Sequence, residues 1–226
     1  KYGELIYAHR DKELFVNLFV ASELNWQEKG LQVIQRTVFP KEGKSTLAIK
    51  TKKSQDFALK IRYPSWVKNE SLTVKVNGKS FKSSKDDLGY FTVNRKWKNN
   101  DKVEIEFPVE VNVEQLPDHS PYYAFRYGPV VLAAKTDTSR MLGLLADDSR
   151  GGHIAKGDQV SMTEIPHLVS QASTLEEHVE MVSPRDLRFQ LNSLQVKNQP
   201  TQMELIPFYQ LHDSRYIIYW PKVESS

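Results

Sequence analysis

Apolar and polar residues alternate along much of the first half of the chain, which is the pattern of half-buried β-strands. The alternation is clear in residues 13–21 and again in residues 57–63. Successive side chains of a strand point to opposite faces of a sheet, so each segment has one face for a core and one for solvent. Asn77-Gly78 stands between two further short strands in residues 72–81 and predicts a tight hairpin. Short strands with turn residues between them predict an antiparallel β-sandwich.

The most apolar run of the chain covers residues 121–135 and is interrupted only by Gly128-Pro129. It predicts one central strand, buried on both faces and bent at these two residues. The composition changes after it, so we place a domain boundary there. Residues 11–135 are expected to form a β-sandwich domain, and residues 136–226 a smaller C-terminal β-rich domain. In the second domain, residues 175–182 are compatible with a short helix or with a strand.

The first residues follow a different period. Tyr2, Leu5 and Ile6 have the spacing of one face of a helix, which predicts a helical segment within residues 1–10. A helix of this length is not stable alone, so its apolar face is expected to lie against a domain outside this sequence. The predicted fold class is therefore all-β, with two antiparallel β-sandwich modules and a short N-terminal helical remnant.

Composition and charge exclude several classes of function. The formal net charge of the 226 residues is +3, which is too small to indicate nucleic-acid binding. Residues 1–135 carry 23 Lys and Arg against 16 Asp and Glu, and residues 136–226 carry 8 against 12. These opposite charges either help two modules to dock or are ordinary solvated faces. No apolar run reaches about 18 residues, so we expect no membrane-spanning helix.

The absence of cysteine excludes disulfides, thiolate catalysis and cysteine-bound zinc within the chain. The six histidines show no metal-ligand spacing, so we expect no metal site and no cofactor in this segment. The densest polar cluster is Asp147, Asp148, Arg150 and His153. It could bind calcium or supply a carboxylate pair for glycoside hydrolysis. We favour a structural role, in which turns and an Asp–Arg pair order the loop, and we assign no catalytic residue.

Two tryptophans are candidates for carbohydrate binding, because exposed aromatic rings on a β-sandwich can stack on sugars. Trp66 follows Tyr63-Pro64-Ser65 at a predicted strand end, and Trp97 lies between two lysines in a predicted turn. We favour packing in the core for each of them, and sugar stacking is the alternative. Trp220 follows an apolar strand and is expected in the core.

Several short motifs, in this order and spacing, resemble the C-terminal portion of glycoside hydrolase family 127, the β-L-arabinofuranosidase-like family. The resemblance runs along nearly the whole sequence. It is carried by Lys1-Tyr-Gly-Glu-Leu-Ile-Tyr7, Leu14-Phe-Val-Asn-Leu-Phe-Val-Ala-Ser-Glu-Leu24, Ile61-Arg-Tyr-Pro-Ser-Trp66, Tyr127-Gly-Pro-Val-Val-Leu-Ala133, Asp147-Asp-Ser-Arg-Gly-Gly-His-Ile-Ala155 and Ile206-Pro-Phe-Tyr209.

The resemblance implies an (α/α)₆ barrel followed by β-sandwich domains, with catalysis in the barrel. There a zinc-bound cysteine is the implied nucleophile and a glutamate the implied acid/base. This chain has no cysteine, so none of those residues can be transferred to it, and zinc is implied only for the missing barrel of the parent protein. Residues 1–10 would then be the remnant of the last barrel helix. The family also implies a periplasmic or extracellular location, with plant-type glycans as ligands.

We therefore expect a non-catalytic β-sandwich region that scaffolds the missing catalytic barrel, its main partner. The first alternative is a carbohydrate-binding module that uses exposed aromatic residues such as Trp66 and Trp97. The second is an independent glycosidase that uses carboxylates such as Asp147 or Asp148. No nucleic-acid or membrane partner is expected.

Overall fold

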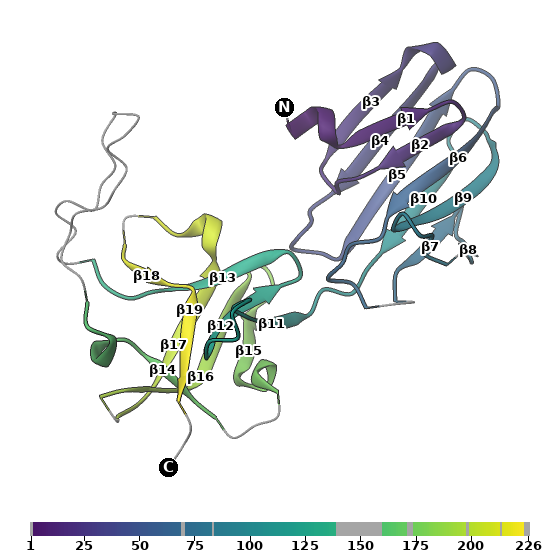
Figure 1. Cartoon of the computed structure of the whole chain (residues 1–226). Coiled ribbons are helices and arrows are strands. Elements are labelled where there is room, and N and C mark those ends of the chain that lie inside the picture. Colours follow the sequence, from purple (N-terminus) through teal and green to yellow (C-terminus); the bar gives the residue numbers. More distant parts are fainter. Residues whose placement is uncertain are drawn as a thin grey trace. The chain divides into compact units, whose positions relative to one another are not determined.

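The predicted fold class is confirmed, because strands make up most of the structure and its helices are single short 3-10 turns (Figure 1). The structure is a computed structural model. It describes residues 2–68, 71–82, 84–138, 160–170, 174–197, 199–212 and 214–223.

The chain divides into two compact units, Lys1–Val109 and Glu110–Ser226. The division lies 26 residues before the boundary expected at residue 135. Residues 110–135 therefore belong to the second unit rather than to the first. The physical reason is that β12 (Tyr122–Tyr127) and β13 (Val130–Lys135) pair with strands near the end of the chain.

The first unit is a sandwich of two sheets. One sheet has the strand order β1-β2-β6-β9 and the other the order β3-β4-β5-β10-β7-β8. The neighbours are antiparallel except for β2 and β6, which are parallel. The first sheet consists of β1 (Tyr7–Arg10), β2 (Glu13–Val16), β6 (Gln55–Arg62) and β9 (Tyr90–Trp97). The second consists of β3 (Ser22–Trp26), β4 (Leu31–Thr37), β5 (Lys44–Thr51), β7 (Thr73–Val76), β8 (Lys79–Phe81) and β10 (Lys102–Glu106).

The core of this unit lies between the two sheets, as the alternation predicts. In β6, Phe57, Leu59 and Ile61 are buried, while the residues between them face outward. Because each strand contributes alternate side chains, the two inner faces together form a continuous apolar layer. Its members from the second sheet include Leu31, Val33, Leu47, Ile49, Val74, Val76, Val103 and Ile105.

The predicted N-terminal helix is only partly correct. A single 3-10 turn, η1, covers Tyr2–Leu5, and β1 begins at Tyr7. β1 pairs with β2 through a two-residue turn in which Asp11 has a φ of 50°. Aspartate tolerates this left-handed backbone, so the hairpin forms and its hydrogen bonds replace those of a helix.

The Asn77-Gly78 hairpin is confirmed. β7 and β8 are antiparallel, and Asn77 and Gly78 have φ values of 51° and 76°. Two successive positive φ values define the turn type that matches the twist of a hairpin. The Asn77 side chain also donates to Asp101 Oδ1 at 2.8 Å and accepts from the Lys102 N–H at 2.8 Å. These bonds tie the hairpin to the turn between β9 and β10.

The second unit is a closed ring of strands rather than the sandwich expected from the sequence. β12, β19, β14, β16, β17 and β13 follow one another, and β13 pairs back to β12. The bounds are β14 His167–Val169, β16 Arg188–Val196, β17 Gln199–Pro207 and β19 Tyr219–Val223. β11 (Val111–Gln115), β15 (Val179–Ser183) and β18 (Tyr216–Ile217) extend the ring at its sides. The short turns are η2 (Gln27–Lys29) in the first unit and η3 (Met162–Glu164), η4 (Leu175–His178) and η5 (Phe208–Gln210) in the second.

The apolar run 121–135 is a hairpin and not one bent strand. Tyr127 pairs directly with Val130, and Gly128 between them has a φ of 54°. Only two residue pairs join β12 to β13 before they diverge, and each strand then pairs with a different part of the ring. The two strands close the ring, and only their middle residues, Ala124 and Phe125 on β12 and Leu132, Ala133 and Ala134 on β13, are buried. Residues 175–182, for which the sequence allowed a short helix or a strand, contain one of each: the 3-10 turn η4 is followed by the strand β15.

A buried glutamine holds the connection between β2 and β3, which the sequence predicted as a continuation of a strand. Gln35 on β4 is 2% exposed, and its Nε2 donates to the carbonyl oxygens of Leu18 and Val20 at 3.0 and 2.9 Å. Its Oε1 accepts from the Ser45 hydroxyl at 3.0 Å. The connection has no ladder of its own, so this side chain supplies the partners that its backbone needs.

No helix in the described ranges is long and apolar enough to cross a membrane.

We expect Gln35→Met to lower the free energy of unfolding of the first unit by about 2 kcal/mol, because the buried Ser45 hydroxyl loses its acceptor and the Leu18 carbonyl loses its donor. Urea denaturation followed by circular dichroism measures this change. Gln27→Met, at an exposed position on η2, is the control and should change stability by less than about 0.5 kcal/mol. Equal effects of the two substitutions would contradict the role assigned to Gln35.

Candidate functional site

Trp97 is not a carbohydrate platform. Its side chain is fully buried at the end of β9, where the ring stacks on Phe57 with centroids 5.5 Å apart. The indole Nε1 donates to the Phe57 carbonyl at 3.0 Å. The lysines on either side suggested an exposed turn, but β9 continues to Trp97 and its alternation turns the indole inward. The candidate role of Trp97 in sugar stacking is therefore wrong, and packing, the favoured interpretation, is what the structure shows.

Trp66 is partly buried at the edge of the sandwich core. Its ring lies parallel to that of Phe39, with centroids 5.8 Å apart and an interplanar angle of 11°, and meets the ring of Phe107 edge-on. Phe39 therefore covers one face of the indole. Only the opposite face of the indole could stack on a sugar. Carbohydrate binding by Trp66 therefore stays a prediction, now limited to that face.

The cluster of Asp147, Asp148, Arg150 and His153 lies outside the described residues. Its role therefore stays a prediction. Within the part of the chain that the structure describes, no group of three or more His, Asp or Glu side chains is arranged to hold a metal ion.

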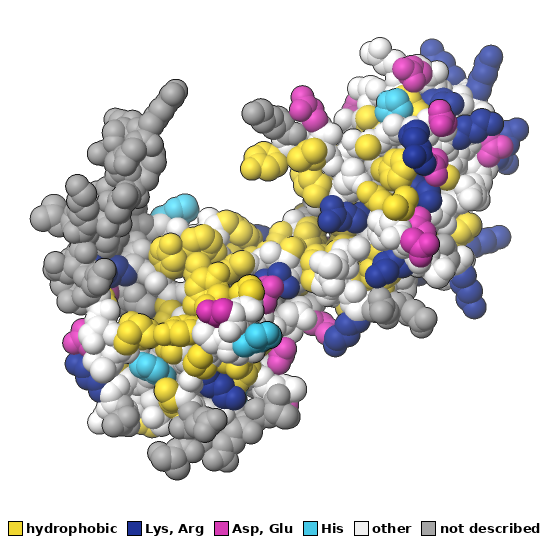
Figure 2. All heavy atoms as spheres, in the orientation of Figure 1, with side chains coloured by type: hydrophobic (Ala, Val, Ile, Leu, Met, Phe, Trp, Pro, Cys, Tyr) yellow, Lys and Arg dark blue, Asp and Glu magenta, His cyan; other side chains and the backbone are white. Residues whose placement is uncertain are grey.

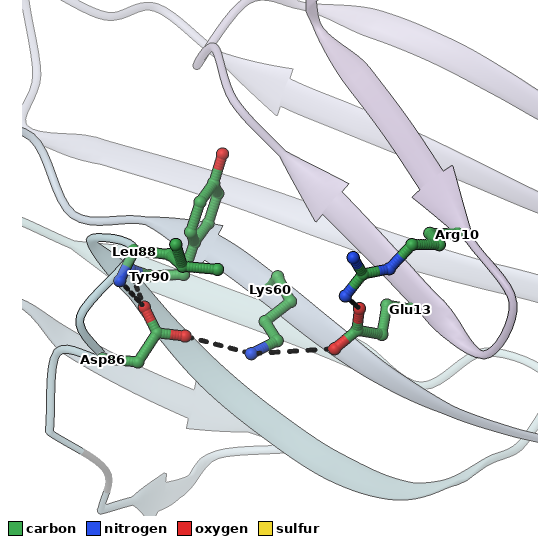
Figure 3. Close-up of polar contacts among 6 residues, drawn as sticks. All are labelled: Arg10, Glu13, Lys60, Asp86, Leu88 and Tyr90. Carbon is green, nitrogen blue, oxygen red and sulfur yellow. Dashed lines mark hydrogen bonds and ion pairs between the residues drawn. The ribbon is translucent and has the colours of Figure 1, made fainter.

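A chain of ion pairs in the first unit lies on the outer face of the β1-β2-β6-β9 sheet (Figure 3). Lys60 projects from β6 between two carboxylates, with Nζ 3.0 Å from Asp86 Oδ2 and 3.8 Å from Glu13 Oε1. Arg10 contacts the same glutamate at 2.9 Å. The Lys60 side chain is only 15% exposed, so its ammonium depends on these two carboxylates for charge compensation.

Asp86 is held as an anion. Its Oδ1 accepts hydrogen bonds from the N–H groups of Leu88 and Tyr90, at 3.1 and 2.8 Å. Burial alone would raise the pKa of Asp86, but the Tyr90 N–H, the Lys60 ammonium and the Leu88 N–H together lower it below its usual value. A glycosidase acid requires the opposite shift, because it must hold a proton near neutral pH. This arrangement therefore suits a structural ion pair.

A groove with exposed tyrosines lies on the second unit. The strand β13 continues into Thr136 and Asp137, which pair with Arg215 through backbone hydrogen bonds of 3.0 and 2.8 Å. This floor positions Tyr216 on β18 and Tyr219 at the start of β19, whose side chains are 50% and 52% exposed. Figure 2 shows hydrophobic side chains gathered over the region of β18 and η5.

The groove combines ring faces with charged groups. Its volume is about 490 Å³, and Asp137, Glu164 and Arg215 line it together with the two tyrosines. The Phe208 ring supports Tyr216, with centroids 5.0 Å apart. Aromatic rings that stack on apolar sugar faces, beside carboxylates and a guanidinium that bind hydroxyl groups, are the components of a carbohydrate site. We call these residues the tyrosine groove.

Sequence reasoning concentrated on tryptophans and missed these tyrosines. The available signal was in Arg215-Tyr-Ile-Ile-Tyr-Trp220. Trp220 is fully buried, as predicted, and its neighbour Tyr219 must point to the opposite face of the same strand. The position of Tyr216 could not be found in this way, because it depends on the pairing of β18 with β13.

Comparison with known protein families divides the chain at the same place as the structure. The middle domain of family 127 β-L-arabinofuranosidases matches residues 13–109. A family described only as a domain of unknown function, DUF4986, matches residues 112–222. No curated protein sequence matches the chain.

Solved structures with the same fold include three glycoside hydrolases. A family 127 β-L-arabinofuranosidase from Geobacillus stearothermophilus T6 superposes with a TM-score of 0.67 at 18% identity, over 98% of this chain and 35% of its own. The family 127 β-arabinofuranosidase BT3674 gives 0.67 at 21% identity, over 96% and 36%. A protein described as a glycoside hydrolase gives 0.66 at 20%, over 96% and 37%. The chain thus spans about a third of the length of each.

We expect Asp86→Asn to lower the free energy of unfolding by about 1 kcal/mol at pH 7, because the Lys60 ammonium loses one of its two anionic partners. The folded-state pKa of Asp86 is lowered, so its stabilisation is fully present above the unfolded pKa of about 3.9. It is lost as the pH falls through the folded pKa. The difference between the two proteins should therefore shrink below about pH 4. Urea denaturation from pH 7 to pH 3 measures it.

The neighbouring aspartate provides a matched control. Asp87 is exposed and takes part in none of the ion pairs found between described residues, so Asp87→Asn should change stability little at either pH. A constant difference between the native protein and Asp86→Asn from pH 7 to pH 3 would contradict the assignment.

Proposed function

We propose that this chain, which belongs to glycoside hydrolase family 127 through its middle domain at residues 13–109, scaffolds the catalytic region of a larger enzyme. The role is non-catalytic. The chain would bind and stabilise that region, and the reaction would take place on residues outside it. The activity of the complete protein is itself part of this proposal, with the arabinofuranosidases of similar fold as the guide.

One observation carries the proposal. Each of the similar enzymes matches nearly all of this chain within about a third of its own length. The sequence has no cysteine, the residue type that the family resemblance implies as nucleophile. The carboxylate that the structure describes most fully, Asp86, serves an ion pair. A supporting role therefore accounts both for the presence of this segment in the larger enzymes and for its lack of the implied nucleophile.

The 3-10 turn η1 supplies a surface for the catalytic region. Ile6 anchors the turn, because its side chain is buried and its carbonyl accepts from the Asn17 N–H at 2.8 Å. Tyr2 and Leu5 on the same turn are 84% and 58% exposed. Large apolar side chains that a fold holds out to solvent at an ordered position favour an interface. We infer that the catalytic region covers these two residues.

The tyrosine groove favours carbohydrate binding as a second function. Tyr216 and Tyr219 present half of their side chains to solvent beside Asp137, Glu164 and Arg215. The groove would bind a neutral, L-arabinose-containing oligosaccharide of the kind that the names of the similar enzymes suggest. The free face of Trp66 is a second candidate platform. An independent glycosidase that uses Asp147 or Asp148 is the remaining alternative, and it depends on residues outside the described part.

The scaffold proposal predicts binding between this chain and the separately produced catalytic region of its parent protein. We expect a one-to-one complex, a higher Tm of the catalytic region and no hydrolysis by this chain alone. Tyr2→Ser combined with Leu5→Ser should weaken the complex at least about tenfold, because two buried apolar side chains are lost from the interface. Isothermal titration calorimetry measures the affinity.

Leu88→Ser combined with Val38→Ser is the matched control, because both residues are exposed apolar side chains of the same unit. This variant should bind like the native chain. The proposal fails if no complex forms or if this chain releases sugar by itself. Equal losses in both double variants would remove the interface assigned to η1.

The carbohydrate-binding proposal predicts that Tyr219→Ala weakens binding of an L-arabinose-containing oligosaccharide about tenfold or more, since one stacking ring is removed. Tyr209→Ala removes a similarly exposed tyrosine that does not line the groove, and it should leave the affinity unchanged. Titration followed by NMR measures both variants. Absence of binding by the native chain would exclude this function without affecting the scaffold proposal.

A further inference from the structure

A polar depression with excess positive charge lies at the end of the first unit where η2 follows β3. It has a volume of about 750 Å³ and is lined by Asn25, Trp26, Gln32, Lys50, Lys52 and Asn99 with their neighbours. No aspartate or glutamate is among its lining residues in the described part of the chain. Figure 2 shows Lys and Arg side chains at this end of the unit. We call these residues the lysine depression.

Sheet geometry orders the polar side chains of the depression. In the registers of β3, β4 and β5, Asn25 lies opposite Gln32, and Gln32 lies opposite Lys50. All three point away from the core, because Trp26, Leu31 and Ile49 beside them are buried. Neighbouring strands are about 4.8 Å apart, so the row extends about 10 Å across the sheet. That is enough for a short oligosaccharide rather than a single ion.

Hydrogen bonds hold this row in place. Gln32 Nε2 donates to Glu23 Oε1 at 2.5 Å and to Asn25 Oδ1 at 3.2 Å, and Lys50 Nζ donates to Asn100 Oδ1 at 2.6 Å. At the rim, Asn99 Oδ1 accepts from the Thr51 N–H at 3.2 Å. Asn25 and Asn99 keep their Nδ2 donors for a ligand, and Lys50 keeps two of its three N–H donors. Gln32 keeps its Oε1 acceptor, because both of its N–H donors are used by Glu23 and Asn25. The polar groups are therefore positioned before any ligand binds.

The charge of the depression is not neutralised by the protein. Lys50 and Lys52 take part in none of the ion pairs found within the described ranges, whereas Lys44 and Lys75 on the same sheet face are paired with Glu106. Residues 1–109 contain 21 Lys and Arg against 13 Asp and Glu, a formal charge of +8. The excess of positive charge is therefore larger for the first structural unit, residues 1–109, than the +7 of residues 1–135. An anionic ligand would gain from both the local and the overall charge.

We propose that the lysine depression binds a carboxylated saccharide, such as a short chain of uronic acid residues. The amides of Asn25, Gln32 and Asn99 would bind its hydroxyl groups, and the ammonium groups of Lys50 and Lys52 would bind its carboxylates. Single-stranded nucleic acid is a poorer match, because it is held by stacking on exposed rings and the one aromatic lining residue, Trp26, is 4% exposed. This proposal is independent of the scaffold function and concerns a different surface from the tyrosine groove.

A pair of matched ligands tests the proposal on the chain of 226 residues. An α-1,4-linked trimer of galacturonic acid and the corresponding galactose trimer differ only in the carboxylate at C6. NMR titration at low salt should show the acidic trimer shifting the side-chain amide signals of Asn25, Gln32 and Asn99. The neutral trimer should bind at least about tenfold more weakly, and higher salt should weaken binding of the acidic trimer.

Charge-matched variants locate the site. Lys50→Gln combined with Lys52→Gln should weaken binding of the acidic trimer about tenfold. Lys41→Gln combined with Lys82→Gln removes the same charge from two exposed positions outside the depression, one before β5 begins and one just after β8 ends. This variant should leave the affinity nearly unchanged. All four lysines are exposed, so the variants should fold normally, and their NMR spectra verify this.

Several outcomes would overturn the proposal. These are absence of binding by the acidic trimer, equal affinity for the neutral trimer, and equal losses in the two double variants. Tighter binding of a single-stranded DNA oligonucleotide than of the acidic trimer, lost in the Lys50→Gln and Lys52→Gln variant, would assign the surface to nucleic acid instead.

Discussion

Each strand of this chain can give only every second side chain to a core, and both the core and the surfaces of the sandwich depend on this constraint. In β6 the inward set is Phe57, Leu59 and Ile61, and the outward set includes Lys60. In β4 the inward residue Gln35 holds the connection between β2 and β3 by hydrogen bonds. Gln32, three residues earlier on the same strand and on its opposite face, belongs to the lysine depression. Stability and binding chemistry thus share the same strands but occupy opposite faces, so a change on one face need not disturb the other.

Local patterns were sufficient to predict most of the first unit. The alternation in residues 57–63 and the Asn77-Gly78 turn depend on neighbours in the sequence, and both are correct. The errors concern residues whose state depends on distant partners. Residues 7–10 are a strand because β2 pairs with them, and Trp97 is buried because β9 extends to it beside β6. The boundary lies at residue 109 because β12 and β13 pair with β19 and β17.

The candidate sites were harder to predict than the strands for the same reason. The lysine depression brings together residues from β3, β4, β5 and the turn before β10, and only the register of the sheet places Asn25, Gln32 and Lys50 in one row. The tyrosine groove likewise needs β18 beside β13. Tryptophans attracted attention in the sequence because they are rare and large, yet two of the four are wholly internal. The two surfaces that we propose for saccharides are therefore built from tyrosine, amide and lysine side chains.

The position of β19 in the second unit has a consequence for the synthesis of the protein. This strand follows all the other strands of the ring in the sequence, and it lies between β12 and β14 and so completes the ring. The sandwich needs no residue beyond 109 to complete its two sheets, and it can fold while the ribosome is still translating the rest. The ring has no such opportunity, since β12 and β14 keep unpaired edges until Tyr219–Val223 have left the exit tunnel. The two units of one polypeptide can therefore fold at different times, and a stop codon between residues 110 and 218 would spare the first unit and leave the second with open edges.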